Sequence, residues 1–412
     1  MNELQAIVDA HAGARARGER TALATIVGVE GSAYRRPGAR MLITAGGRTT
    51  GTISAGCLER DVAEHAAQVM GSRAARVIEY DTRGDEDVVW GSGLGCNGVV
   101  RVLLESLHEG SAGACALQFV AERLRARKGG VIATVIAGKT NAGGDEARAA
   151  TVGARLLLDD ELNVRGQRLT ARGLVGRVRA DAQGILAGRR AAVRAYDTAG
   201  GRAEIFYDVI TPPRPLVVFG AEHDALPLVR QARAVGWHVT IVDTRARRAT
   251  GERFAEADEI MLCRAADVTA HVSLTEDTAA VVMTHNYLDD VELLRALLPS
   301  PVCYLGLLGA KQRAEKLLEE LGAGSRGPTA AQIARLHSPV GMDIGAETPE
   351  EIALSIVAEI KAVSAARRGG FLRDRAAPIH YGCGPEPVGP DAGTETYAPT
   401  PENASLISCH TS

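Results

Sequence analysis

The sequence predicts an α/β protein, with an N-terminal α+β domain followed by a C-terminal Rossmann-like domain, a doubly wound parallel sheet. Three observations predict this fold class. Apolar segments alternate with glycine turns over residues 21–104, strands alternate with helical segments after residue 215, and three prolines separate these regions within residues 211–215. Proline interrupts both helices and strands, so residues 211–215 are predicted to link domains spanning residues 1–210 and 216–370.

The predicted N-terminal domain begins with an amphipathic helix in which Leu4, Ile7 and Val8 share one face. Short apolar runs bounded by turn residues then predict strands, and residues 131–210 are predicted to be rich in them. The segments predicted as strands are TALATIVGV, ARMLITA, ARVIEYD, GVVRVLLES, VIATVIAG, GARLLLDD, AAVRAYD and RAEIFYDVI, and CLERDVAEHAAQVM is predicted to be a helix.

The C-terminal domain begins with PLVVFG, a nearly uniform apolar run typical of a strand buried on both faces. The helical segment DALPLVRQARAVG and the strands HVTIVDT, EIMLC, AAVVMTH and PVCYLG follow, which predicts βαβ units. A last helix is predicted at Pro349, with Thr348 as N-cap and Glu351 completing a capping box. Residues 371–412 are rich in proline and glycine without periodicity, and are predicted to be a mostly disordered tail.

Composition excludes several classes of function. The 412 residues are 46% hydrophobic, enough for two cores, but only 4% aromatic, which disfavours base stacking. A net charge of −3 gives no field that attracts nucleic acid or an anionic membrane, and no apolar run approaches the ~20 residues of a membrane span. Seven widely spaced cysteines without a CxxC pair argue against a disulfide scaffold. We therefore expect a soluble cytoplasmic protein.

The turn after PLVVF occupies the place of a dinucleotide-binding loop. Gly220 supplies its first glycine, but Glu222 stands where a second glycine lets the backbone approach a pyrophosphate, and its carboxylate would repel a phosphate. Asp243 ends the next predicted strand about twenty residues later, where an acid binds a ribose hydroxyl. The turn thus predicts a Rossmann-like fold and disfavours ordinary NAD binding.

Two further loops follow predicted strands, at the edge where open α/β sheets bind ligands. MTHNYLDD offers Thr284, His285 and Asn286 as ligand contacts, and for His285 a capping or packing role is the alternative. YLGLLGAKQR places Gly309 before Lys311 and Arg313 at a predicted helix start. Backbone N–H groups and two cations there predict an anion site, and a solvated helix face is the alternative.

Arg35, Arg36 and Arg40 surround a Pro37-Gly38 turn between two predicted strands. Guanidinium groups on such a loop suit phosphate recognition, because the planar fork meets two oxygens at once. A solvated hairpin tip is the alternative interpretation.

Two cysteines are flanked by glycines, in GTISAGCLERDV and in GSGLGCNGVV. Cys57 precedes a predicted helix, whose dipole favours the thiolate that attacks or ligates. The alternatives are a buried structural cysteine, a zinc ligand with only His65 nearby, a protease nucleophile without a recognisable histidine partner, and a disulfide between Cys57 and Cys96.

Taken together, these blocks resemble the XdhC/CoxI family. EGSAYRRPGARMLI, GTISAGCLERDV and GLGCNGVVRVLLE are similar to its N-terminal motifs. VVFGAEHDALPLVRQARAVGWHVTIVDTR, MTHNYLDD, YLGLLGAKQR and PVGMDIGAETPEEIALSIVAEI resemble its C-terminal Rossmann domain. The resemblance covers residues 20–106 and 215–370. The chain departs from the family at Ala55, where a first glycine is usual, and at Glu222, where glycine is common.

The resemblance implies a chaperone rather than an enzyme. Such a protein binds the molybdenum cofactor, as molybdopterin or its dinucleotide form, and supports its sulfuration together with a cysteine desulfurase. It then delivers the cofactor to a xanthine dehydrogenase-type molybdenum hydroxylase, and a homodimer is possible. An NAD(P)-dependent oxidoreductase and an adaptor with an empty Rossmann domain are the alternatives.

With that resemblance, we predict cofactor contacts from both domains and no catalytic residue, and Cys57 is the candidate contact to molybdenum. Soft sulfur ligands suit such a metal. The predicted contacts are Arg35, Arg36, Gly56, Cys57, Glu59, Gly95, Cys96, Asn97, Gly220, Asp243, His285, Asn286, Gly309, Lys311 and Arg313.

Overall fold

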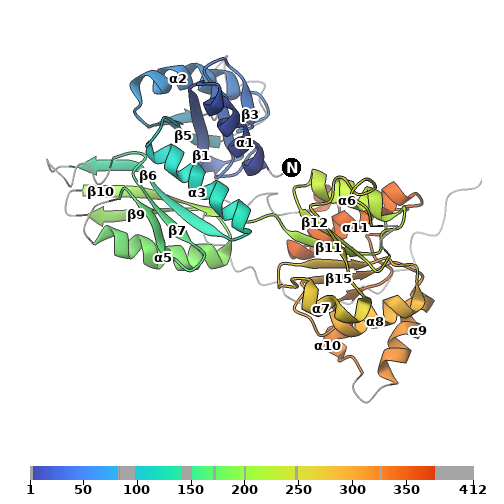
Figure 1. Ribbon diagram of the computed structural model, residues 1–412. Coiled ribbons are helices and arrows are strands. Elements are labelled where there is room, and N and C mark those ends of the chain that lie inside the picture. Colours follow the sequence, from blue (N-terminus) through green and yellow to red (C-terminus); the bar gives the residue numbers. More distant parts are fainter. Residues whose placement is uncertain are drawn as a thin grey trace, which may run out of the picture.

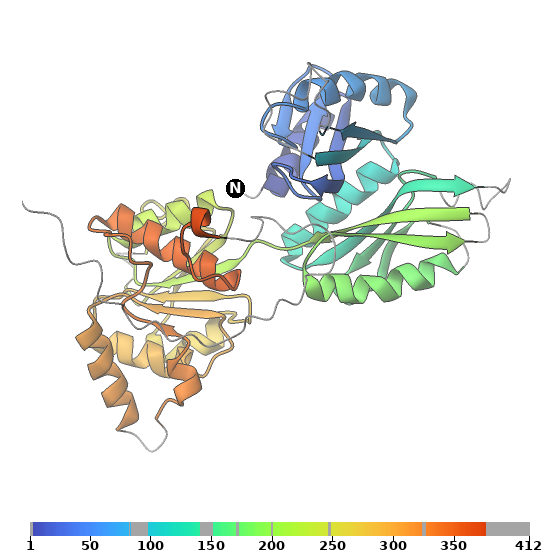
Figure 2. The same cartoon turned by 180° about the vertical axis from the view of Figure 1, so that it is seen from behind.

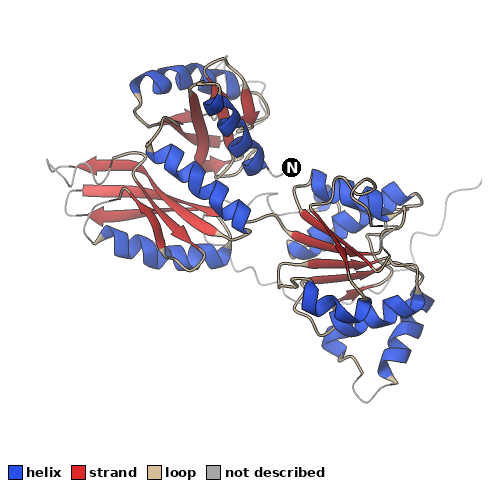
Figure 3. Cartoon of the chain, viewed as in Figure 1, coloured by secondary structure: helices blue, strands red, loops and turns tan. Residues whose placement is uncertain are grey.

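The chain folds into three sheets, which the computed structural model shows as two halves joined by one short connection (Figure 1). The model describes residues 3–81, 83, 98–140, 151–169, 173–198, 201–245, 249–323 and 327–375. Gly95, Cys96, Asn97 and most of the predicted tail lie outside the described residues. The predicted α/β class is confirmed: the N-terminal half combines antiparallel sheets with helices, and the C-terminal half is a parallel Rossmann-like sheet (Figure 3).

The first sheet is antiparallel, with strand order β3-β2-β1-β5-β4. Helix α2 packs on one face, and buried Val62 and Ala66 join its core cluster. The predicted N-terminal helix is confirmed, with Ile7 fully buried. The elements are α1 (Glu3–Ala16), β1 (Thr21–Gly31), β2 (Arg40–Thr44), β3 (Thr49–Gly51), α2 (Glu59–Ser72), β4 (Arg76–Asp81) and β5 (Gly98–Ser106).

The second sheet has the order β8-β7-β6-β10-β9 and is also antiparallel. Its elements are α3 (Ala112–Ala126), β6 (Gly130–Thr140), β7 (Arg155–Asp159), β8 (Val164–Gln167), α5 (Leu174–Gly188), β9 (Ala192–Thr198) and β10 (Gly201–Ile210). The strand-rich prediction for this region missed helix α5. Its buried residues Leu174, Val178, Ala182 and Ile185 recur at helical spacing, but three glycines in LVGRVRADAQGILAG weaken the helical signal.

The two sheets are copies of one arrangement. Each consists of a helix, three strands, a second helix and two strands, and the third, second, first, fifth and fourth strands lie side by side in both. The register agrees: Glu105 lies opposite Leu23 in the first copy, and Asp208 lies opposite Ile132 in the second. We call these copies the first repeat (residues 3–106) and the second repeat (residues 112–210).

Two buried ion pairs cross between the repeats. Arg40 at the start of β2 pairs with Asp208 in β10, and Arg155 at the start of β7 pairs with Glu105 in β5. Each arginine also donates to a glycine carbonyl two residues earlier in its own repeat. Burial, followed by the nearby charge of Arg155, lowers the pKa of Arg40 to about 10. The interpretation of Arg40 as a phosphate ligand is therefore wrong, because its guanidinium is enclosed between the sheets.

The third sheet is parallel throughout, with strand order β13-β12-β11-β14-β15-β16. Helices α6 and α11 cover one face, and α7, α8 and α9 cover the other (Figures 1 and 3). The elements are β11 (Pro215–Phe219), α6 (Ala225–Ala234), β12 (His238–Asp243), β13 (Glu259–Leu262), η1 (Ala265–Asp267), α7 (Val268–His271), β14 (Ala279–Val282), α8 (Tyr287–Leu297), β15 (Tyr304–Leu307), α9 (Lys311–Gly322), α10 (Ala330–Ile333), β16 (Leu336–His337), α11 (Pro349–Ser364) and η2 (Leu372–Asp374).

The strand order reverses between β11 and β14, which are neighbours although β12 and β13 intervene in sequence. Such a topological switch point opens a crevice at the carboxyl ends of the strands. The predicted capping box is also confirmed: the Thr348 side chain accepts from the Glu351 N–H, and the Glu351 carboxylate accepts from the Thr348 N–H.

Contacts between the two halves involve the amino ends of strands in the parallel sheet, opposite the carboxyl ends that form the crevice. Arg189 forms a two-pronged ion pair with Asp277, which precedes β14, with N–O distances of 2.5 and 2.7 Å. Arg127 pairs with Glu259 at the start of β13, at 3.0 Å. The carboxyl ends of the strands therefore point away from the N-terminal half (Figures 1 and 2). No helix in the described part of the chain is long and apolar enough to span a membrane.

Candidate functional site

Cys57 lies in the turn that joins β3 to α2, two residues before the helix begins. Its side chain is partly exposed and forms no disulfide. The preceding Gly56 has a φ of 111°, a conformation that favours glycine, and a Cβ at this position would meet no atom of the described residues within 4 Å. The turn is therefore open to solvent at Gly56, and the partly exposed thiol of Cys57 lies next to this open side. We call residues 52–59 the thiol loop.

The thiol loop is folded around the carboxylate of Glu59. The Oε1 atom accepts from the backbone N–H groups of Ile53 and Ser54, at 3.2 and 2.7 Å. The Oε2 atom accepts from the Gly56 N–H at 3.1 Å and from the Ser54 hydroxyl. Burial raises the pKa of Glu59, but the hydrogen bonds from Ser54 and the backbone together lower it by a larger amount. The net pKa therefore lies below the usual value. Glu59 is thus an ionised anchor inside the loop.

The start of the thiol loop is held by Arg35 and by helix α1. The Arg35 guanidinium donates to the Thr52 hydroxyl at 3.0 Å and to Glu3 at 2.5 Å, and Glu3 accepts from the Thr52 N–H at 3.2 Å. The structure thus ties Arg35 to the first residue of the loop that carries Cys57. Arg36, the next residue, is exposed.

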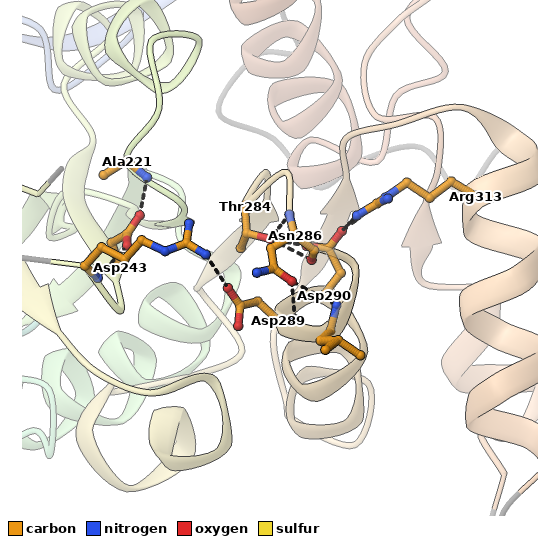
Figure 4. A network of polar contacts seen from close by, with 9 residues as sticks. Ala221, Asp243, Thr284, Asn286, Asp289, Asp290 and Arg313 are labelled. Carbon is orange, nitrogen blue, oxygen red and sulfur yellow. Dashed lines mark hydrogen bonds and ion pairs between the residues drawn. The ribbon is translucent and has the colours of Figure 1, made fainter.

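A second candidate region is the crevice at the carboxyl ends of β11, β12 and β14. Asp243 lies here, with its side chain buried and turned toward the protein (Figure 4). Its carboxylate accepts from the Ala221 N–H at 2.8 Å and from the Arg245 N–H at 2.7 Å. Asp243 therefore ties the first Rossmann turn to the second strand, and this arrangement gives no support to ribose recognition by that residue.

On the other side of the crevice, the loop after β14 is held by Asp290, whose side chain is buried (Figure 4). Asp290 accepts from the Thr284 hydroxyl at 2.6 Å and from the Arg313 guanidinium at 2.7 Å. Asn286 is the N-cap of α8, and its side chain accepts from the Leu288 and Asp289 N–H groups. Arg313 and Asn286 thus both have structural partners, and the role of Asn286 as a helix cap was not predicted from the sequence.

His285 reaches across the switch point. Its Nε2 atom lies 2.7 Å from the Asp224 carboxylate, which belongs to the turn after β11. The His285 backbone has a φ of 56°, unusual for a residue other than glycine. The second Asp224 oxygen is buried, and no other described residue forms a hydrogen bond with it. This pair joins the two loops that border the switch point.

The two cations of the anion site predicted at the start of α9 have different surroundings in the structure. Gly309 has a φ of 141° and packs against the Arg313 side chain. Lys311 is exposed, and no ion pair links it to another described residue, whereas Arg313 is committed to Asp290. Lys311 is therefore the cation of this turn that a ligand reaches without breaking an existing ion pair.

A small cleft lies beside these loops, and residues at the carboxyl ends of β11, β12, β13 and β14 line it. Three of its polar residues, Arg245, Cys263 and Asp289, are not among the contacts predicted from the sequence. The position of Cys263 directly after β13 was the available signal, because residues following parallel strands line such clefts. Arg245 and Asp289 lie 3.6 Å apart at the mouth of the cleft. Among the described residues, no cluster of three or more His, Cys, Asp or Glu side chains is arranged to hold a metal ion.

Comparisons with known proteins agree with the fold. Residues 216–360 match the family model described as the XdhC Rossmann domain, and residues 14–81 match the model of the XdhC and CoxI family. A Bacillus subtilis protein, described as a probable subunit of xanthine dehydrogenase, is 32% identical over 83% of this chain and 92% of its own length. A molybdenum cofactor insertion chaperone of Escherichia coli, PaoD, is 24% identical over 84% of each chain.

A solved structure from Bacillus halodurans, described as a xanthine dehydrogenase, is also similar. It superimposes with a TM-score of 0.70 and 30% identity, covering 89% of this chain and 97% of its own. The similarity therefore extends over both halves of the molecule.

Proposed function

The chain belongs to the XdhC and CoxI family, and from this premise we propose that it binds the molybdenum cofactor and delivers it to a xanthine dehydrogenase-type hydroxylase. The proposal includes support for sulfuration of the cofactor before delivery. The names of two relatives support this direction, since one is described as part of a xanthine dehydrogenase and the other as a cofactor insertion chaperone. We propose that the chain is a binding and delivery factor rather than an enzyme.

The observation that carries the proposal is the position of Cys57. Its thiol is partly exposed on a loop fixed by two acidic side chains, Glu3 and Glu59. A sulfur atom is the donor type that suits a soft metal centre, and a fixed loop reduces the entropy lost when a ligand binds. Molybdenum chemistry is supplied by the cofactor when it is bound. The chain would supply the thiol of Cys57 and the backbone around Gly56.

The Rossmann crevice suits a different part of an anionic ligand. Lys311 offers an exposed positive charge in the turn after β15, and His285 lies beside the switch point, where open α/β sheets bind ligands. A cleft lined by Gly220, Arg245 and Thr284 lies on this side. We propose that phosphate or nucleotide groups bind on this side. Asp243 already accepts from the N–H groups of Ala221 and Arg245, which gives its carboxylate a structural role in this half.

The proposed partners follow from the proposed role. A hydroxylase of the xanthine dehydrogenase type would receive the cofactor, and a cysteine desulfurase would supply the sulfur. The thiol loop and the Rossmann crevice lie on separate halves of the chain, and the strand ends that form the crevice face away from the N-terminal half. A homodimer would offer a second copy of each.

The test is cofactor retention. We would purify the chain from a host that makes the cofactor and convert any bound pterin to its fluorescent oxidised form. We expect pterin with the wild type and with Cys115→Ala, a matched exposed thiol on α3, and loss of most of it with Cys57→Ala. A wild-type chain that neither retains pterin nor binds added cofactor contradicts the proposal. Saturable binding in a nicotinamide titration would support the oxidoreductase alternative.

A further inference from the structure

We propose that Glu59 is the positioning residue of the thiol loop and makes no contact with the ligand itself. Its carboxylate fills a cluster of inward-pointing backbone N–H groups and so fixes the conformation in which Cys57 is presented. The inference rests on the proposed function only in treating Cys57 as the working thiol, and its test needs no cofactor.

The hydrogen-bonding capacity of Glu59 is already used inside the loop. Oε1 accepts two backbone N–H groups, and Oε2 accepts one backbone N–H and one hydroxyl. An ionised carboxylate offers about four acceptor positions, so four donors leave none for a ligand. The Ser54 hydroxyl extends the cluster, because its oxygen also accepts from the Gly56 and Leu58 N–H groups at 3.2 and 3.1 Å.

The donors surround Cys57 along the chain. Ile53, Ser54 and Gly56 precede it and Leu58 follows it, so hydrogen bonds to Glu59 or Ser54 fix the backbone on both sides of the thiol. Without the carboxylate, these N–H groups would have to find water or another anion, since an unpaired buried donor costs about 1–3 kcal/mol. The loop conformation therefore depends on one acidic side chain.

The second repeat provides an internal comparison. Helix α5 corresponds to α2, and Leu174 is buried at the place of Leu58. The buried positions of the two helices share one spacing, so that Val178, Ala182 and Ile185 correspond to Val62, Ala66 and Val69. Aligned in this way, Gly173 corresponds to Cys57 and Val175 to Glu59. The copy without the thiol thus also lacks the carboxylate. Both copies keep the apolar residue that packs into the core, so the fold itself does not require the acid.

The thiol is the natural readout of loop geometry. We would measure the rate at which iodoacetamide alkylates Cys57 in cofactor-free protein, by mass spectrometry of its peptide, with the exposed Cys115 as an internal reference. In Glu59→Ala the loop loses its anchor and a neighbouring negative charge, and both changes favour attack by the thiolate. We expect Cys57 to react several-fold faster, whereas Cys115 is unchanged.

Chemical rescue separates positioning from general stability. Formate is a free carboxylate small enough to occupy the vacated cluster in Glu59→Ala. We expect formate, but not chloride at equal ionic strength, to slow Cys57 alkylation toward the wild-type rate. Glu64→Ala, which removes an exposed acid from the same helix, serves as the control and should match the wild type. Glu59→Gln is the second variant if the alanine variant fails to fold.

Two results would overturn the inference. One is an unchanged Cys57 rate in folded Glu59→Ala or Glu59→Gln, and the other is a faster rate that formate does not reverse. Because alkylation is measured without cofactor, absence of pterin from the wild type would contradict the proposed function and leave this result standing.

Discussion

Arg40 and Asp208 form a buried ion pair that joins the first repeat to the second, although 168 positions separate them in the sequence. Arg155 and Glu105 form the corresponding pair in the opposite direction. Each arginine is the first residue of the second strand in its own repeat, and each acid lies on the last strand of its own repeat. The four charges balance, so the interface between the sheets contains a neutral polar centre within an apolar surround. This arrangement specifies how the two repeats pack.

Removing one partner of this centre should destabilise the N-terminal half strongly. Arg40→Met leaves Asp208 buried without its cation, which typically costs about 3–5 kcal/mol. The double variant Arg40→Met/Asp208→Leu should recover most of this loss, because an apolar pair of similar volume avoids burying charge. Urea unfolding of both single variants and the double variant gives the coupling energy. Additive losses would show that the pair contributes no specific interaction.

Much of the fold was predictable because local patterns decide it. The nearly uniform apolar strand at residues 215–219 indicated a parallel sheet, and Thr348 with Glu351 indicated a helix start. The relationship between the repeats was missed, because Arg40 and Arg155 look like ordinary turn arginines until their distant partners are known. An arginine at the first position of a buried strand points into the protein or out of it, and no local signal distinguishes the two.

The candidate sites show the same division. Arg35 and Glu59 both bind the thiol loop that carries Cys57, because a short turn and adjacent strands bring these segments together. That arrangement was predictable. The bond from Ala221 to Asp243 was not, because it depends on how closely the ends of β11 and β12 approach. The prediction for Asp243 rested on the residue type usual at that position, whereas the direction of its carboxylate depends on the N–H groups of Ala221 and Arg245.

Two glycines with nearly the same backbone conformation should respond differently to alanine. Gly56 and Gly220 have φ values of 111° and 112°, so strain of about 1–3 kcal/mol applies to both. A Cβ on Gly56 meets open space, but one on Gly220 would collide with the backbone of Met283 and lie 2.9 Å from the Thr284 Cα. Overpacking adds about 1–3 kcal/mol at Gly220. In chemical denaturation, Gly220→Ala should therefore have a much lower free energy of unfolding than Gly56→Ala. Equal denaturation midpoints would contradict this ranking.

Lys311 and Arg313 should separate binding from stability. Arg313→Met removes the cation beside the buried Asp290 carboxylate and should cost about 3–5 kcal/mol. Lys311→Met removes an exposed charge and should change stability by less than about 0.5 kcal/mol. If the crevice binds an anionic ligand, Lys311→Met should nevertheless weaken retention of the pterin. Thermal unfolding and the pterin assay on the same preparations test this, and unchanged retention would remove Lys311 from the site.

Glu359 predicts how the Rossmann half responds to acid. It lies on α11 and accepts from the Tyr304 hydroxyl and from the Gly341 N–H at 2.9 Å, and His337 Nδ1 lies 3.1 Å away. Burial raises the pKa of Glu359, but these hydrogen bonds together lower it by a larger amount, and the one with His337 has the largest effect among them. The net pKa of Glu359 is therefore below the usual value. Ionised Glu359 therefore stabilises the fold fully above the unfolded-state pKa, and this contribution is lost as the pH falls through the lowered folded-state pKa.

Glu359→Gln tests that sign. At neutral pH the variant should be less stable by about 1–3 kcal/mol, because hydrogen bonds to a charged acceptor are lost. Between about pH 6 and pH 3 its stability should fall less steeply than that of the wild type, so that the two curves converge in acid. Glu315→Gln, an exposed acid on α9, should instead follow the wild-type curve. Urea unfolding across this range is the measurement, and parallel curves for wild type and Glu359→Gln would show that ionised Glu359 adds no pH-dependent stability.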